Sequence, residues 1–163
     1  MYQIQCLNKI SPLGLNRFGD DYAISTEEQS PDGILVRSAS MHDMPFGEKL
    51  LSIARAGAGV NNIPVDACTE KGIVVFNTPG ANANAVKELV LCALFLTSRK
   101  ITASTDWVKT LKGKGDEVGK LVEKGKSAFA GPEIQGKTLG VVGLGAIGIL
   151  VANAAEQLGM TVY

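Results

Sequence analysis

The sequence predicts an α/β protein built on parallel sheets, and three observations support that prediction. Before residue 80, short apolar runs alternate with turns and helical stretches, as they do where crossover helices join parallel strands. A long amphipathic stretch follows from about Asn84. After residue 136, a short apolar run enters a glycine-rich turn, which leads into a second amphipathic stretch. The chain therefore contains two strand–helix regions joined by a long helix.

The first region contains five candidate strands and one helix. The strands are expected at residues 4–7, 22–24, 33–36, 50–55 and 73–76. A helix is expected over residues 63–71, because Pro64 suits a first helical turn and Gly72 suits a helix end. An open α/β sheet accounts for this order of elements.

The second region begins with a helix whose apolar residues recur at helical spacing. These residues are Val86, Leu89, Val90, Ala93, Leu94 and Ile101. Residues 112–127 interrupt the pattern with glycines and lysines, and we expect an exposed, partly helical excursion there.

Residues 143–148 have the sequence Gly-Leu-Gly-Ala-Ile-Gly, a complete G-x-G-x-x-G after the apolar run 139–142. In this turn Gly143 permits the tight bend, and Gly145 lets a pyrophosphate approach the backbone. Gly148 lets the following helix pack closely on the strand, and the N-terminus of that helix favours phosphate. We predict the start of a Rossmann dinucleotide-binding domain.

A second strand is expected at residues 160–162, directly after that helix. The acidic residue that holds the adenosine ribose normally lies about twenty residues past the glycines. Because Tyr163 is the last residue, we expect the chain to be cut off partway through this domain. The residue that separates NAD from NADP would then lie beyond Tyr163.

A competing motif overlaps the glycine turn. Residues 131–138 satisfy G-x-x-x-x-G-K-[ST], the phosphate loop of nucleoside triphosphatases. That loop needs a strand before it and a helix starting at its Lys-Thr. Here the β-prone residues follow the motif, so we interpret Lys137 and Thr138 as the start of the Rossmann strand. A triphosphatase is the weaker alternative.

Composition favours an intracellular enzyme over a nucleic-acid or membrane protein. The chain is 45% hydrophobic with formal net charge zero, and no apolar run approaches the roughly 20 residues of a membrane span. Its first residues lack the pattern of a signal peptide. Cys6, Cys68 and Cys92 are expected to be buried, reduced thiols rather than disulfide or metal-binding residues, which fits the cytoplasm.

Two candidate strands end in an arginine followed by small residues. Arg37-Ser38 follows the strand at 33–36, and Arg55 followed by residues 56–59 ends the next strand. Open α/β sheets bind ligands at these strand ends, where guanidinium and backbone N–H groups can hold an anion. Either arginine taken alone is more typical of a solvated surface residue. Two such turns at equivalent strand ends make an anion site an equal alternative.

Four ordered motifs resemble the D-2-hydroxyacid dehydrogenase family. They are Val-Arg-Ser at 36–38, Arg-Ala-Gly-Ala-Gly-Val-Asn-Asn-Ile at 55–63, Phe-Asn-Thr-Pro-Gly at 76–80, and Gly-Lys-Thr-Leu-Gly-Val-Val-Gly-Leu-Gly-Ala-Ile-Gly at 136–148. The resemblance implies a flavodoxin-like substrate domain over residues 1–84, without its C-terminal segment. It implies a hinge helix and the incomplete NAD-binding Rossmann domain over residues 85–163.

The resemblance also implies residue roles. Substrate binding is expected from Arg37, Ser38, Arg55, Ala56 and Gly57, and cofactor binding from Ala58, Gly143, Gly145, Ala146, Ile147 and Gly148. No metal ligand is expected. Asn61 stands where the family usually has an aspartate, and Ala146 replaces a frequent arginine. Loss of that arginine is expected to weaken cofactor binding without abolishing it.

The implied reaction is hydride transfer between NAD and a 2-hydroxy acid, with 3-phosphoglycerate of serine biosynthesis the preferred substrate. The catalytic arginine, histidine and glutamate of the family are expected beyond Tyr163, and the sole histidine, His42, is expected to be an incidental surface residue. The chain alone is therefore expected to be inactive. The parent is expected to be a cytoplasmic homo-oligomer that binds neither nucleic acid nor membrane. A non-catalytic NAD(H)-sensing module of the same fold is the alternative, since some relatives act as transcriptional corepressors.

Overall fold

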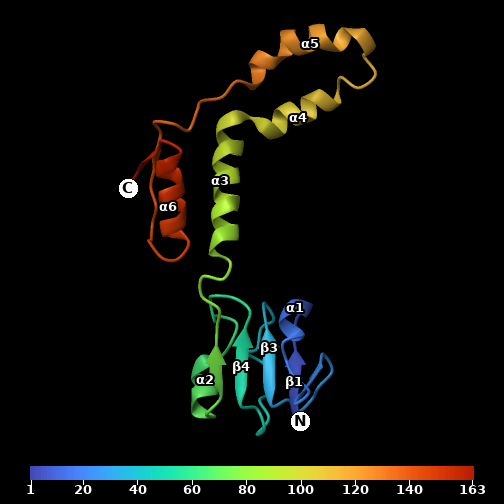
Figure 1. Cartoon of the computed structure of the whole chain (residues 1–163), viewed down its shortest axis with the longest axis vertical. Coiled ribbons are helices and arrows are strands. Elements are labelled where there is room, and N and C mark those ends of the chain that lie inside the picture. The colour runs from blue at the N-terminus through green and yellow to red at the C-terminus, as the bar shows by residue number, and fades with distance from the viewer. The chain divides into compact units, whose positions relative to one another are not determined.

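The structure, a computed structural model, describes residues 1–163 and divides them into two compact units, Met1–Ala81 and Asn82–Tyr163 (Figure 1). The first unit is built around a parallel sheet. Its strands are β1 (Tyr2–Cys6), β2 (Tyr22–Ser25), β3 (Gly33–Val36), β4 (Ser52–Arg55) and β5 (Val74–Phe76). They lie in the order β2-β1-β3-β4-β5. This is the flavodoxin-like order, and the predicted α/β fold with a parallel sheet is confirmed.

Two short helices accompany this sheet, α1 (Pro12–Leu15) and α2 (Val65–Glu70). The expected helix at 63–71 is shorter in the structure because Pro64, with ψ 79°, lies outside the helix at its N-cap. The strand expected at 50–55 begins two residues later, since Leu50 closes a turn by donating its N–H to the carbonyl of Gly47.

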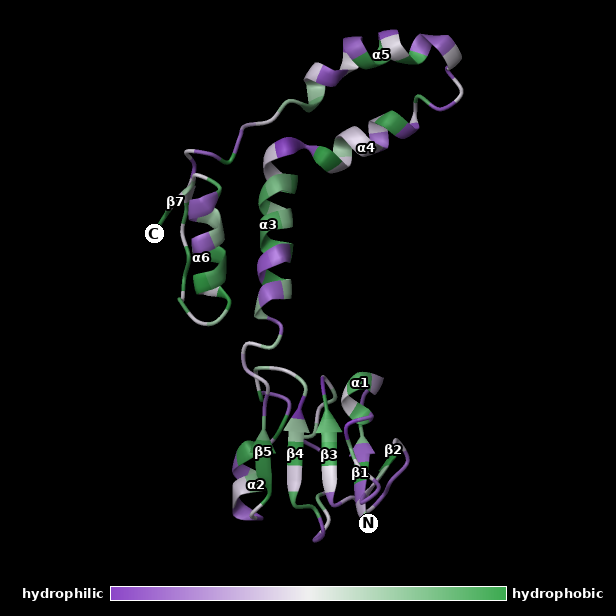
Figure 2. Cartoon of the chain, in the orientation of Figure 1, coloured by the Kyte–Doolittle hydropathy of each residue, from purple (hydrophilic) through white to green (hydrophobic).

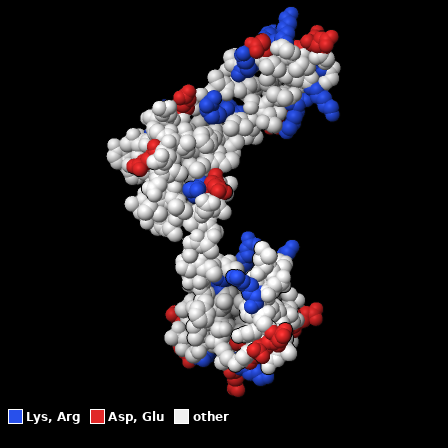
Figure 3. Space-filling model, viewed as in Figure 1, with Lys and Arg blue, Asp and Glu red and all other residues white.

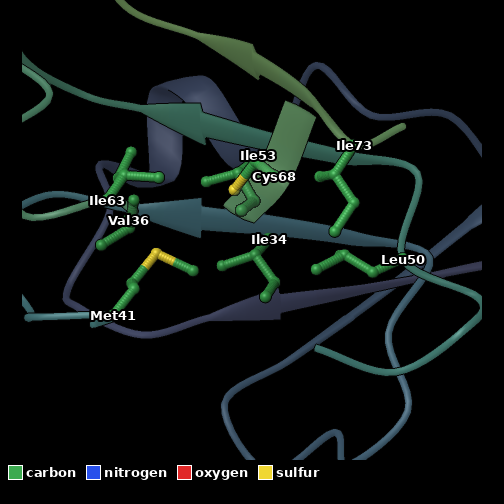
Figure 4. Close-up of a cluster of buried hydrophobic side chains, with 8 residues drawn as sticks. All are labelled: Ile34, Val36, Met41, Leu50, Ile53, Ile63, Cys68 and Ile73. Carbon is green, nitrogen blue, oxygen red and sulfur yellow. The ribbon is translucent and has the colours of Figure 1, made fainter. Parts of the chain in front are cut away.

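One face of the sheet carries the core of the first unit (Figure 4). Ile34 and Val36 of β3 and Ile53 of β4 point to the same side and are almost fully buried. They are covered by Cys68 of α2 and by the segment between β3 and β4, which contributes Met41. This packing fixes the positions of the strand ends from which the candidate site extends.

The opposite face is only partly covered. By the strand register, Tyr2, Tyr22, Val74 and Phe76 share this face, and all four are exposed. Figure 2 shows β5 as hydrophobic, although Phe76 is 57% exposed. Parallel sheets are normally buried on both faces, so this surface is unusually apolar for one in contact with water.

The second unit is mainly helical. It contains α3 (Ala83–Arg99), α4 (Ile101–Lys109), the 3₁₀ turn η1 (Gly115–Glu117), α5 (Val118–Gly125), the 3₁₀ turn η2 (Lys126–Phe129), β6 (Thr138–Leu139), α6 (Gly148–Gln157) and β7 (Thr161–Val162). The strands β6 and β7 pair in parallel and are joined by α6, which makes one βαβ unit. Its core joins Ile134, Ala155 and Met160, and Leu94 of α3 packs against them.

Several expectations for this unit need correction. The helix expected to carry Ile101 ends earlier, because Lys100 adopts a left-handed conformation with φ 47° and separates α3 from α4. Leu89 is 70% exposed rather than on a buried face.

The three cysteines were all expected to be buried. Cys92 is exposed on α3, whereas Cys6 and Cys68 of the first unit are buried as expected. Burial raises the pKa of the Cys6 and Cys68 thiols, which keeps them protonated and poor nucleophiles.

The segment after α4 is an exposed, partly helical excursion, as predicted. It comprises η1, α5 and η2, with Trp107 of α4 packed on Phe129 at 5.1 Å between ring centroids. The strand expected at 139–142 is limited to Thr138–Leu139, and Val142 is fully exposed because β6 has a single neighbouring strand. No helix of the chain is both long and apolar enough to span a membrane.

The order of elements around residues 131–138 argues against a triphosphatase loop. The turn η2 precedes this segment and the strand β6 ends it. A phosphate loop requires a strand before the motif and a helix after it. The interpretation of Lys137 and Thr138 as the entry to the strand agrees with β6 starting at Thr138.

Candidate functional site

The candidate substrate-binding residues lie at the carboxyl edge of the five-stranded sheet. We use "carboxyl edge" for Asn8 after β1, residues 37–39 after β3, residues 55–59 at the end of β4, and residues 77–78 after β5. Because the strands are parallel and adjacent, their carboxyl ends meet at one side of the unit. Figure 3 shows basic side chains at the end of this unit toward which the strand arrows of Figure 1 point.

The loop after β4 is held in place by the end of β5. Thr78 donates its N–H to the carbonyl of Gly57 at 3.0 Å, and the side-chain amide of Asn77 donates to the carbonyl of Ala58 at 2.7 Å. On the other side, the N–H of Ala56 reaches the carbonyl of Val36 at 2.8 Å. The loop is therefore fixed to both neighbouring strands.

The Arg55 side chain lies over this loop. Its Nε donates to the carbonyl of Arg37 at 3.1 Å, while its Nη1 is buried without a hydrogen-bond partner. A Cβ added to Gly59 would lie 2.9 Å from that Nη1, and one added to Gly57 would lie 3.4 Å from Nε. Small residues in the loop thus leave room for the guanidinium.

Arg37 and Ser38 are exposed at the end of β3. The backbone N–H groups of Arg37, Ser38 and Ala39 all donate to Oδ1 of Asn8, at 2.8, 3.0 and 3.1 Å. The structure therefore brings Arg37, Ser38 and Arg55 together, with the Arg37 side chain free of any protein acceptor.

The N–H groups of Ala58 and Gly59 donate to no protein group. Both residues are exposed. Two free donors beside the Arg55 guanidinium, with the exposed Arg37 at the adjacent strand end, form a surface that can bind an anion. Charge-assisted hydrogen bonds to oxyanions are stronger than neutral ones. The donors and positive charge of this edge are suited to a carboxylate or a phosphate.

The glycine turn in the second unit has the three geometric features expected of a phosphate-binding turn. Gly143 has φ 94°, a conformation that L side chains rarely adopt. A Cβ on Gly145 would have no neighbour within 4 Å, so that side of the backbone is open to a ligand. A Cβ on Gly148 would overlap the carbonyl oxygen of Gly143, so α6 packs against the turn only with glycine there. Ala146 and Ile147 are exposed beside the start of α6.

Substitutions at two of these glycines should change different properties, cofactor affinity at Gly145 and stability at Gly148. Gly145→Val adds a side chain in open space, so the melting temperature should change little while NADH affinity falls at least about tenfold, or about 1.4 kcal/mol. Gly148→Ala creates overlap with Gly143, which should cost roughly 1–3 kcal/mol of stability.

Thermal melts followed by circular dichroism and NADH fluorescence titrations of the chain measure both effects. Gly145→Ala is the matched control with a smaller side chain. Equal NADH affinity in Gly145→Val and the parent would remove residues 143–148 from the cofactor site.

His42 is exposed and has a defined contact. Its Nε2–H donates to the carbonyl of Asn61 at 2.9 Å, and the N–H of Met41 donates to the carbonyl of Asn62 at 2.9 Å. The imidazole thus joins the segment after β3 to the loop after β4. This is more than the incidental surface position expected, although it remains a structural contact.

Sequence reasoning missed the amide side chains that hold this edge. Asn8, Asn62 and Asn77 each bond to backbone groups of a neighbouring loop, Asn62 through its amide to the carbonyl of Ala39 at 2.8 Å. Each follows a strand by one to several residues. For Asn8 and Asn77, which lie within two residues of a strand end, a polar amide at that place was the available signal.

With this geometry established, comparison with known proteins identifies the family. The model of the D-isomer specific 2-hydroxyacid dehydrogenase catalytic domain matches residues 25–161. The chain belongs to that family. D-3-phosphoglycerate dehydrogenase of Mycobacterium bovis is 40% identical over 131 residues, covering 78% of this chain and 23% of that protein. The rat D-3-phosphoglycerate dehydrogenase is 36% identical over 163 residues, covering 95% of this chain and 28% of that protein.

The fold agrees with solved structures of this class. The NAD+-bound 3-phosphoglycerate dehydrogenase of Entamoeba histolytica superimposes with a TM-score of 0.69 at 27% identity, over 99% of this chain and 52% of that one. The chain spans between 20% and 28% of the length of the curated relatives it matches. The predicted membership of the 2-hydroxyacid dehydrogenases is confirmed.

Proposed function

We propose that this chain provides the substrate-binding edge and the pyrophosphate-binding turn of an NAD-dependent dehydrogenase that acts on 3-phosphoglycerate. The observation that carries the proposal is the pair Arg37 and Arg55 at the carboxyl edge. Nε of Arg55 donates a hydrogen bond to the backbone carbonyl of Arg37. The similarity to D-3-phosphoglycerate dehydrogenases supports this choice among 2-hydroxy acids.

In this proposal, residues 1–84 belong to the substrate domain and residues 85–163 to the hinge helix and NAD-binding domain. Arg37 and Ser38, together with Arg55, Ala56 and Gly57, bind the acidic groups of the substrate. Ala58 lies toward the nicotinamide end of the cofactor. Gly143, Gly145, Ala146, Ile147 and Gly148 hold the pyrophosphate.

The chain's own residues bind and orient the reactants. The guanidinium groups of Arg37 and Arg55 neutralise the substrate's phosphate and carboxylate, and the N–H groups of Ala58 and Gly59 offer further donors. The open side of Gly145 fits a dinucleotide pyrophosphate, and the N-terminus of α6 supplies a favourable dipole. Bound NAD supplies the hydride acceptor. No step of proton transfer is assigned to His42, whose Nε2–H is held by a carbonyl oxygen.

We place the enzyme in a reducing compartment, the cytoplasm, which the three free cysteines support. We also propose that it is a homo-oligomer. Exposed apolar side chains on α3 and α4, such as Leu89 and Val108, support a contact surface for a second copy.

Fluorescence titrations of the chain test the cofactor class. NADH should show saturable enhancement of its emission on binding, because the turn at 143–148 accepts a pyrophosphate. ATP with magnesium should bind no more tightly than ATP alone, since the element order around residues 131–138 is wrong for a phosphate loop. Magnesium-dependent ATP binding without any NADH enhancement would overturn the dehydrogenase proposal.

A further inference from the structure

We propose that Asn8 is a positioning residue for anion recognition, which acts by holding the turn that carries Arg37. The inference rests on the proposed function, because it assigns a purpose to a contact at the same carboxyl edge. Asn8 itself does not need to touch the substrate.

A single side-chain atom makes this contact. One oxygen, Oδ1 of Asn8, accepts hydrogen bonds from three consecutive backbone N–H groups, those of Arg37, Ser38 and Ala39, at 2.8–3.1 Å. Successive N–H groups that converge on one point form a concavity that attracts an oxyanion. Here the concavity is filled by an oxygen of the protein, so the turn is shaped before any ligand arrives.

The position of Asn8 explains why it can reach this turn. Asn8 lies two residues past β1, and Arg37 is the first residue past β3, which pairs directly with β1. In the order β2-β1-β3-β4-β5, this pair is the point at which the strand order reverses. Ligands of open α/β sheets bind in the crevice at such a point.

Both backbone groups of Arg37 are fixed as a result. Its N–H is held by Asn8, and its carbonyl oxygen accepts from Nε of Arg55 at 3.1 Å. The carbonyl of Ala39, two residues on, accepts from the side-chain amide of Asn62. The exposed Arg37 side chain therefore extends from a fixed base, which reduces the entropy lost when it binds an anion.

The amide is chemically suited to this role. A neutral carbonyl oxygen satisfies the three donors without adding negative charge beside Arg37 and Arg55. A carboxylate would hold the turn at least as firmly but would repel a phosphate. Substitutions of Asn8 can therefore distinguish two contributions to anion affinity, the shape of the turn and the charge near the ligand.

The test uses the 163-residue chain, with 3-phosphoglycerate as the probe, in NMR titrations and amide hydrogen exchange. Asn8→Leu keeps a similar size but removes the acceptor, so exchange at residues 37–39 should accelerate and the dissociation constant should rise about tenfold. Asn8→Asp should keep slow exchange at 37–39. Its affinity should be intermediate at low salt and approach the parent value as salt screens the added charge.

Asp32→Leu is the matched control. Oδ2 of Asp32 accepts the N–H of Gln3 at 2.7 Å and links the same two strands at their amino-terminal ends, with the same separation of 29 residues in sequence as Asn8 and Arg37. Its loss should lower the melting temperature yet leave the dissociation constant within about twofold. An equal loss of affinity in Asp32→Leu and Asn8→Leu would mean that Asn8 acts only through stability and would overturn the inference.

Two further outcomes separate this inference from the proposed function. If Asn8→Leu binds like the parent while Arg37→Ala and Arg55→Ala lose affinity, the positioning role fails and the anion site stands. If the arginine variants bind like the parent, or the parent shows no saturable binding, the proposed site and the inference both fail.

Discussion

The purified 163-residue chain should oxidise 3-phosphoglycerate with NAD at no more than about 1% of the rate of an intact relative. General acid–base catalysis contributes typically about 10²–10⁴-fold, and histidine is its usual carrier near neutral pH. The sole histidine, His42, has its Nε2–H committed to the carbonyl of Asn61. Binding groups alone should therefore not sustain turnover.

The formation of NADH, followed by absorbance, measures this rate. Because a trace of host enzyme would also produce NADH, the Gly145→Val chain, purified in the same way, is the control. At an NAD concentration well below saturation, residual activity that is equal in both preparations comes from a contaminant. Activity above about 1% that disappears in Gly145→Val would belong to the chain and would contradict the prediction.

The same preparations report on the uncovered sheet face of the first unit. Tyr2, Val74 and Phe76 are each more than half exposed there, and we expect the chain to self-associate as its concentration rises. Activity should therefore be measured at a concentration where light scattering shows no large particles.

The local patterns of the sequence were sufficient to predict much of the fold. The strand 33–36 has the predicted bounds, because it is a short apolar run with two β-branched residues, Ile34 and Val36, which favour a strand. The glycine turn was also predicted in detail, since each glycine answers a separate steric demand within six residues. Signals of this kind are contained in a short stretch and need no knowledge of the rest of the chain.

The features that were missed depend on contacts distant in sequence. Asn8 bonds to residues 29–31 positions away, and nothing next to it in sequence indicates that partner. The break at Lys100 was missed because lysine carries no sequence signal for a left-handed conformation. Cys92 was expected to be buried from its apolar neighbours, but the helix that carries it presents that side to solvent.

Arg37→Ala and Arg55→Ala should each weaken binding of 3-phosphoglycerate to the chain by about ten- to a hundredfold. A hydrogen bond to a charged group is worth roughly 1.5–3 kcal/mol, and each 1.4 kcal/mol is about tenfold in the dissociation constant. NADH affinity should stay nearly unchanged, because the glycine turn lies in the other unit. In the two arginine variants, the affinity for glycerate, which lacks the phosphate, should fall less than the affinity for 3-phosphoglycerate. This comparison tests the choice of substrate.

Lys71→Ala is the control for simple loss of charge. Lys71 lies between α2 and β5, at the amino-terminal edge of the sheet, and its removal should change the dissociation constant by less than about twofold. An equal effect of Lys71→Ala and Arg37→Ala would mean that net charge alone attracts the ligand. Unchanged affinity in both arginine variants would make them ordinary solvated residues.

The contact between the two arginines gives this prediction a sharper form. Because Nε of Arg55 holds the carbonyl of Arg37, Arg55→Ala removes its own ligand contact and also loosens the base of Arg37. It should therefore weaken binding more than Arg37→Ala, and the double variant should lose less than the sum of the two. Residues in contact typically show a coupling energy of about 0.5–3 kcal/mol when the two single variants and the double variant are compared in a double-mutant cycle.

Arg55→Lys should recover only part of the affinity, since an ammonium group restores the charge but lacks the forked donors that reach a carbonyl and an anion together. Strict additivity of the two alanine substitutions, together with full recovery in Arg55→Lys, would show that the arginines act as independent point charges.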